Sequence, residues 1–170
     1  MVLIEYGMNI KNNIVIYVDG SCLSNGNPDA IGGYSIVAID ENTNEVVDCI
    51  AKRTEMTTNN REELKAVLLS LIKYGKEETP VIVYSDSTYV VNTFNDWMFN
   101  WQKNDWTKGD GKKPENLDLI NMYFAYHASG YRIDLKKVKG HNGTFGNEIA
   151  DKLATGKITP SEVMKLYGKK

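Results

Sequence analysis

The chain has 170 residues, a formal net charge of −2 and a sequence pI of about 5.7. This length suits one domain that buries its core without disulfides, and the mild negative charge excludes a polycation that coats nucleic acid over its whole surface. The two cysteines and two histidines are too few and too scattered for a structural zinc site.

The first eight residues contain the acidic Glu5, with no basic start and no long apolar run. They therefore predict neither a signal peptide nor a membrane span. Both thiols are compatible with a reducing compartment. We expect a cytoplasmic protein.

Two apolar segments end in the same way. Residues 14–19 and 81–86 are short runs of β-branched and aromatic residues that end in Asp19 and Asp86. Such runs predict buried strands, which places both carboxylates at one edge of a sheet. Carboxylates that converge in a partly desolvated cleft are costly without a cation, and oxygen ligands favour Mg²⁺ or Mn²⁺. The pattern therefore indicates metal-dependent chemistry.

The remaining elements follow in chain order. Residues 24–29 are rich in turn formers and are expected to be a loop, and the segments 33–39 and 45–50 after it are expected to be antiparallel strands. A helix is predicted from about residue 60 to residue 74.

Beyond the strand at 81–86, helical segments carry the tryptophans, and a strand over 131–138 precedes a glycine-rich loop and another helix. Residues 159–170 are expected to form a short helix capped by Thr159. Strands first, then strand and helix in alternation, predict one α/β domain with a mixed sheet and helices packed against it.

The helix at 60–74 begins with two neighbouring acids, and helical geometry distinguishes them. Its buried stripe is predicted from the spacing of Leu64, Val67, Leu68 and Leu71. At roughly 100° per residue, Glu63 lies at the edge of the stripe and Glu62 nearly opposite it. Glu63 is therefore the better ligand candidate. The alternative is a capping box between Asn60 and Glu63.

Two further candidates lie near the C-terminus. Asp151 is close to a helix start, where an acid can also simply complement the helix dipole. His141 lies in a loop with three glycines and can carry protons beside a metal–carboxylate cluster, although an exposed loop histidine can also be incidental.

Residues 97–113 combine tryptophan side chains with lysines. These tryptophans and lysines are Trp97, Trp101, Trp106, Lys103, Lys108, Lys112 and Lys113. This composition suits phosphates and sugars, but Asp96, Asp105 and Asp110 dilute the charge. The alternative is a solvated helix pair whose tryptophans pack on each other.

Four motifs, in this order, resemble those of the type 1 ribonucleases H. They are Asp19–Cys22, Thr57–Leu64, Ser85–Ser87 with Tyr89 and Val90, and the segment from Val138 to Asp151. The resemblance covers about residues 14–154. It implies the α/β ribonuclease H-like fold: a five-stranded mixed sheet, with three antiparallel strands and then parallel strands, flanked by helices. We expect a single domain over 1–170, with a core of about 14–155 and a short helical extension at 159–170.

The resemblance also implies an activity. The expected protein is a monomeric endoribonuclease that hydrolyses the RNA strand of RNA:DNA hybrids and leaves 3′-hydroxyl and 5′-phosphate ends. Two Mg²⁺ ions, which Mn²⁺ can replace, would be held by Asp19, Glu63, Asp86 and Asp151, with Asp19 as the bridging ligand. His141 would assist proton transfer or product release, and Glu62 would be a bystander.

Substrate contacts are expected from small polar groups, because only one strand of a hybrid carries 2′-hydroxyls. By resemblance the contacts come from Cys22, Asn25 or Asn27, Thr58, Asn59, Asn60, Ser87, Trp97 and Trp101, with Lys103, Lys112 and Lys113 as the basic groups. The residues alone also allow Asn59 and Asn60 to be helix caps. The choice between Asn25 and Asn27 stays open.

Two other functions are compatible with the same fold. One is a nuclease for DNA junctions or double-stranded RNA, and the other is a hybrid-binding module without catalysis. A hybrid-binding module without catalysis would not need the four acids together with His141. A nuclease for another duplex is not expected to keep the Thr-Asn-Asn and Lys-Gly-His motifs together.

Overall fold

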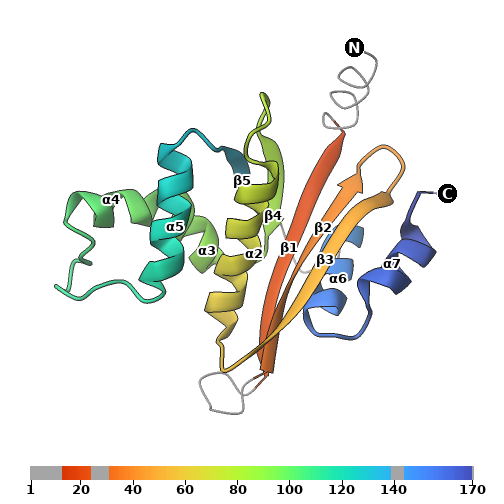
Figure 1. Ribbon diagram of the computed structural model, residues 1–170, viewed down its shortest axis with the longest axis horizontal. Coiled ribbons are helices and arrows are strands. Elements are labelled where there is room, and N and C mark those ends of the chain that lie inside the picture. Colours follow the sequence, from red (N-terminus) through yellow and green to blue (C-terminus); the bar gives the residue numbers. More distant parts are fainter. Residues whose placement is uncertain (1–12, 24–30, 139–143, 170) are drawn as a thin grey trace.

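The computed structural model describes residues 13–23, 31–138 and 144–169. One sheet with the strand order β3-β2-β1-β4-β5 runs through it (Figure 1). The strands are β1 (Ile14–Leu23), β2 (Ile31–Asp40), β3 (Glu45–Glu55), β4 (Val81–Ser85) and β5 (Ile133–Lys137). β1, β2 and β3 pair antiparallel, whereas β4 pairs parallel to β1 and to β5. The predicted five-stranded mixed sheet is confirmed.

The three antiparallel strands are longer than their apolar segments. β1 continues to Leu23, and β3 continues to Glu55 through a polar sequence. Backbone pairing with β2 extends both strands, since ladder hydrogen bonds do not require buried side chains. The apolar pattern alone could not show this extension.

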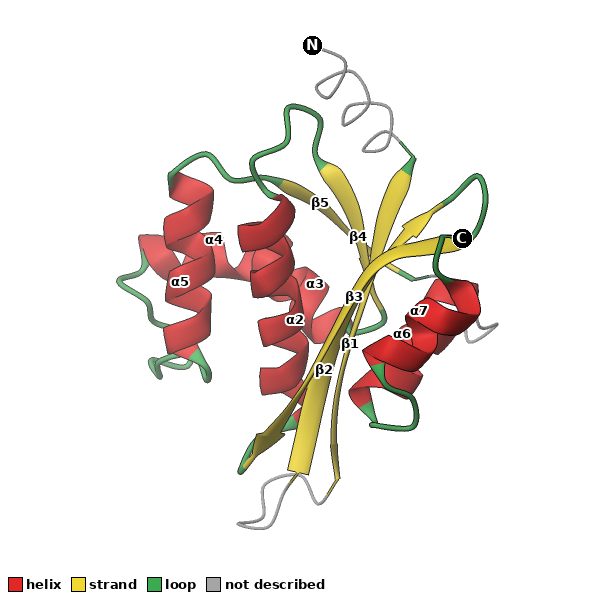
Figure 2. Cartoon of the chain, turned by 45° about the vertical axis from the view of Figure 1, so that its right-hand side comes forward, coloured by secondary structure: helices red, strands yellow, loops and turns green. Residues whose placement is uncertain are grey.

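Helices cover both faces of the sheet (Figure 2). They are α2 (Asn59–Tyr74), α3 (Thr88–Asn92), the π-helical turn η1 (Thr93–Trp97), α4 (Met98–Lys103), α5 (Leu117–Ala128), α6 (Phe145–Ala154) and α7 (Pro160–Tyr167). α2 packs on β1 and β2, and α5 packs on α2. α6 lies on the opposite face against the same two strands, and α7 lies against β3.

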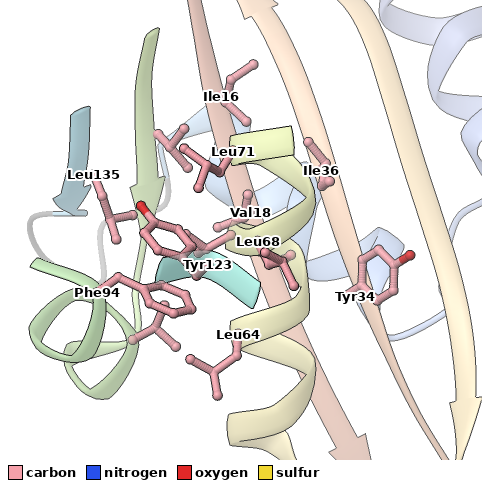
Figure 3. Close-up of a cluster of buried hydrophobic side chains, with 14 of the residues drawn as sticks. Ile16, Val18, Tyr34, Ile36, Leu64, Leu68, Leu71, Phe94, Tyr123 and Leu135 are labelled. Carbon is pink, nitrogen blue, oxygen red and sulfur yellow. The ribbon is translucent and has the colours of Figure 1, made fainter. Parts of the chain in front are cut away.

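The larger core cluster lies between α2 and the sheet (Figure 3). Ile16 and Val18 of β1 lie beside Leu71 and Leu68 of α2, and all four side chains are buried. Beside them Phe94 stacks on Tyr123, with ring centroids 3.8 Å apart. A second cluster lies under α6 and α7 and includes Ile149, Leu153 and Val163.

The helix starts only partly match the sequence pattern. α2 begins at Asn59 because Thr58 is the cap, and its hydroxyl accepts a hydrogen bond from the Arg61 backbone N–H at 3.1 Å. The alternative capping box between Asn60 and Glu63 is therefore wrong. The predicted cap of the last helix is confirmed, because Thr159 and Glu162 form a capping box.

In the part of the chain described here, no helix is long and apolar enough to cross a membrane.

Candidate active site

The parallel pairing of β1 with β4 brings the two strand-end aspartates together. The register sets Tyr17 beside Tyr84. Asp19 and Asp86 each lie two residues further along, so the same register places them level at the carboxyl edge of the sheet. Asp19 is buried, with 5% of its surface exposed, whereas Asp86 is exposed.

The first turn of α2 lies directly against β1 at Gly20. A Cβ atom at this residue would lie 2.3 Å from the Glu63 backbone nitrogen and 2.5 Å from the Glu62 carbonyl carbon. Only glycine permits such an approach between two backbones. This contact brings Glu63 next to Asp19.

Asp19, Glu63 and Asp86 form one carboxylate cluster. Each offers an oxygen, and these oxygens lie within 4.8 Å of one another. The carboxyls of Glu63 and Asp19 share a hydrogen bond. The Glu63 Oε2 atom is buried and has no hydrogen-bond partner.

Burial and like charges raise the pKa values of the two buried acids of the cluster. Burial, and then the charges of Asp86 and Asp151, raise the pKa of Asp19 to about 7. Burial and the charges of Asp19 and Asp86 raise the pKa of Glu63 well above its ordinary value. A hard divalent cation would relieve both effects, since it pairs with the charged form of each carboxyl.

Asp151, the fourth predicted acid, is on α6, on the opposite face of the sheet, and is not among the three carboxylates of the cluster. Three sheet side chains fix the carbonyl end of α6: Ser35 donates to the Ala150 carbonyl at 2.6 Å, and Ser21 and Arg53 donate to the Ala154 carbonyl at 3.0 Å and 2.8 Å. Asp151 is exposed on this anchored helix, and its charge contributes to the raised pKa of Asp19.

Glu62 is not on a solvent-facing surface of α2, and the predicted position is wrong. Its side chain is fully buried, with 0% exposure. Its Oε2 accepts a hydrogen bond from the Thr57 hydroxyl at 2.7 Å and lies 2.8 Å from the Lys65 ammonium. β2 passes over the start of α2, so residues outside the apolar stripe are buried there as well. Helical periodicity could not reveal this cover.

A cleft of about 450 Å³ opens at the first turn of α2. It is lined by Thr58, Asn59, Asn60, Glu115 and Asn116. The first three are among the predicted substrate contacts. Asn116 was not predicted; it lies in the left-handed region at φ 58° and is the cap position of α5.

Arg61 holds the side of this cleft that Glu115 and Asn116 form. Like Asn116, Arg61 is not among the predicted substrate contacts. Its guanidinium donates to both carboxylate oxygens of Asp118, at 3.0 Å and 2.6 Å, and to Asn116 at 3.3 Å. For Asn116 the sequence did hold a signal: it follows Pro114 and Glu115 directly before a helix, and asparagine tolerates the left-handed backbone region.

Cys22 follows Asp19 by three residues at the end of β1, and Ser87 directly follows Asp86. The Cys22 thiol donates to the Thr57 carbonyl at 3.3 Å, which ties the end of β1 to the turn before α2. The Ser87 hydroxyl accepts from the Val90 backbone N–H at 3.2 Å and caps α3. Both residues are partly exposed.

The tryptophans pack on other rings and also keep some exposed surface. Trp97 lies 6.1 Å from Trp101 and 6.4 Å from Tyr89, measured between ring centroids. Trp97 is nevertheless 37% exposed. The side chains of Lys103, Lys112 and Lys113 are exposed on the same segment.

Three predicted site residues lie outside the described residues: His141, Asn25 and Asn27. The segment with His141 connects β5, beside Asp86, to α6, which carries Asp151.

Comparisons with known proteins agree with this geometry. The RNase H family model matches residues 11–159. The Ribonuclease H of Caldanaerobacter subterraneus subsp. tengcongensis is 39% identical over 153 residues, which is 88% of this chain and 95% of that protein. The Ribonuclease HI of Haemophilus ducreyi is 39% identical over 144 residues, 84% of this chain and 88% of that protein.

Among solved structures, the solution structure of the PFV RNase H domain superposes with a TM-score of 0.73 at 26% identity, covering 85% of this chain and 93% of that one. Because the family model spans most of the chain and the relatives match over nearly their whole length, the chain belongs to the RNase H family.

Proposed function

We infer that this RNase H family member is an endoribonuclease that hydrolyses the RNA strand of RNA:DNA hybrids with the help of divalent metal ions. The observation that carries the inference is the carboxylate cluster of Asp19, Glu63 and Asp86, whose oxygens lie within 4.8 Å of one another. Its two buried carboxyls, Asp19 and Glu63, lie among like charges that raise their pKa values, and one Glu63 oxygen has no hydrogen-bond partner. Such a donor set fits hard cations.

We further propose that two Mg²⁺ ions, replaceable by Mn²⁺, bind to Asp19, Glu63, Asp86 and Asp151. Bound ions would supply Lewis acid chemistry for the hydrolysis of the phosphodiester, which would leave 3′-hydroxyl and 5′-phosphate ends. Asp19 is hydrogen-bonded to Glu63 and is close enough to Asp86 and Asp151 for their charges to raise its pKa, so it is the ligand best placed to be shared. Asp86 and Asp151 are exposed and face the incoming substrate.

Hybrid recognition is assigned to the edge of the sheet and the start of α2. Thr58, Asn59 and Asn60 line a cleft with Asn116, and their amide and hydroxyl groups suit a sugar–phosphate backbone. Cys22 and Ser87 lie next to the carboxylates, where they can contact the strand that is cut. Trp97 and Trp101, with Lys103, Lys112 and Lys113, extend the surface toward the second strand. Shape and 2′-hydroxyls, rather than base identity, then select the substrate.

Other expectations stay predictions. His141 is proposed to transfer a proton or assist product release, and Asn25 or Asn27 to contact substrate. The chain is proposed to be a monomeric, cytoplasmic protein with a single domain over 1–170, a core of about 14–155 and a short extension at 159–170. The last helix, α7, buries Val163 against β3, so it adds to the second core cluster.

The test is cleavage of end-labelled RNA:DNA, RNA:RNA and DNA:DNA duplexes, with Mg²⁺ and with EDTA. We expect metal-dependent cutting of the RNA strand of the hybrid alone. Cutting of another duplex would instead indicate a nuclease of different specificity. Hybrid binding without cutting would indicate a module without catalysis.

A further inference from the structure

A lysine outside the predicted substrate contacts lies beside the carboxylate cluster. β5 pairs parallel to β4, and the register sets Lys137 next to Ser85. Ser85 is the residue directly before Asp86, and the Val138 backbone N–H donates to the Ser85 carbonyl at 2.9 Å. The end of β5 is therefore fixed at the same edge of the sheet as the aspartates.

The orientation of Lys137 follows from strand alternation. Side chains two residues apart share a face, so Lys137 is on the face of the buried Leu135, toward α3. The Lys137 ammonium donates to the Thr88 hydroxyl at 2.6 Å. Thr88 is the first residue of α3 and follows Asp86 by two residues. The ammonium is thus fixed beside the loop that carries Asp86.

The hydrogen-bonding capacity of this pair is only partly used. An ammonium has three donor protons, and one of them bonds Thr88; the Thr88 hydroxyl accepts that bond and keeps its own proton for another acceptor. Across the described part of the chain, no carboxylate lies within ion-pair distance of Lys137. By contrast, the neighbouring Lys136 lies 3.5 Å from Asp134 on the other face of the strand.

We propose that Lys137, together with Thr88, binds a backbone phosphate of the hybrid next to the carboxylate cluster. The proposal rests on the proposed function, since it requires a hybrid bound at this edge. Four acids at the site repel a polyanion, and a cation beside them lowers the free energy of bringing the flanking phosphates close. The pair supplies an ammonium and a hydroxyl, which are both donors for phosphate oxygens.

The test is the salt dependence of hybrid cleavage by Lys137→Ala, with Lys136→Ala as the matched control on the opposite face. For Lys137→Ala we expect KM to rise about 3–10-fold at low salt with kcat nearly unchanged. We also expect the slope of log(kcat/KM) against log[salt] to fall in magnitude by about one, as for the loss of one phosphate contact. Lys136→Ala should leave both values close to those of the unaltered protein.

Two further measurements separate the possible outcomes. Thr88→Val should raise KM less than Lys137→Ala, since it removes the partner hydroxyl but keeps the charge. If Lys137→Ala lowers the melting temperature while the salt slope stays unchanged, the lysine only ties β5 to α3 and the proposal is wrong. Equal KM values for Lys137→Ala and Lys136→Ala would also overturn it.

Failure of the proposed function can be recognised independently. Hybrid binding is measured by fluorescence anisotropy in an Asp19→Asn background, with and without Lys137→Ala. If the unaltered protein does not cut the hybrid, the proposed function fails, and the salt slope of binding still decides the role of Lys137.

Discussion

Glu62 and Glu63 are adjacent in sequence, and both are buried, but their surroundings are opposite. Glu62 accepts a hydroxyl hydrogen bond and pairs with the Lys65 ammonium. Glu63 has the carboxylates of Asp19 and Asp86 as neighbours, and each of the two glutamates has one buried oxygen without a hydrogen-bond partner. A buried carboxylate with a cation and a donor is part of the structure, whereas one held against other carboxylates costs stability until a cation arrives.

The difference shows that burial by itself does not identify a functional acid. Glu62 is less exposed than Glu63, at 0% against 7%. What separates them is the charge of the neighbouring groups. The comparison can be tested by removing each charge and by altering the contact that holds both residues in place.

The largest effect is expected from Asp19→Asn. This substitution removes the central charge of the cluster while keeping the shape of the side chain, so turnover of an RNA:DNA hybrid should fall by more than about 10³-fold. Steady-state cleavage with Mg²⁺ measures the effect. Asp134→Asn, an exposed aspartate on β5, is the control and should keep normal rates. Near-normal activity of Asp19→Asn would show that the cluster is not the catalytic centre.

Gly20→Ala acts on both glutamates at once. The added Cβ would lie 2.3 Å and 2.5 Å from backbone atoms of Glu63 and Glu62, which cannot move without shifting α2. We expect the free energy of unfolding to fall by at least about 3 kcal/mol, with activity falling in parallel. Denaturant titration measures the loss. Gly109→Ala, where the added atom meets nothing within 4 Å, should have little effect.

The stability of the metal-free protein should depend on pH through Asp19. Its pKa is raised from 3.8 to about 7 by burial and by like charges, so the folded state binds more protons than the unfolded state between these values. Stability therefore falls as the pH rises through this range, by on the order of 2–3 kcal/mol. The advantage of Asp19→Asn over the unaltered protein, measured by denaturation in EDTA, should grow from pH 4 to pH 7. A difference that stays constant with pH would contradict the pKa shift.

Glu62→Gln should affect stability rather than turnover. It removes the charge that pairs with Lys65 but keeps an oxygen for the Thr57 hydroxyl, and Lys65 is partly exposed and can regain water. We expect a loss of about 1–2 kcal/mol in the free energy of unfolding, with kcat within about twofold of normal. Glu78→Gln, at an exposed position, is the control. A large loss of kcat would place Glu62 with the catalytic acids.

The sequence by itself determined the mixed sheet with helices packed against it and the two strand-end aspartates. Short apolar runs that end in an acid specify both a buried strand and the place where its polar end emerges. The choice of Glu63 over Glu62 as the member of the cluster also agrees with the structure. Its stated reason does not, because both side chains are buried.

Only the tertiary structure decided how the side chains around the site are used. The parallel register sets Asp19 level with Asp86, the backbone contact at Gly20 brings Glu63 to them, and bonds from three sheet residues to α6 fix the helix that carries Asp151. Lys137 reaches Thr88 only because β5 lies beside β4. These contacts join residues far apart in the chain, and local periodicity carries no information about which of them meet.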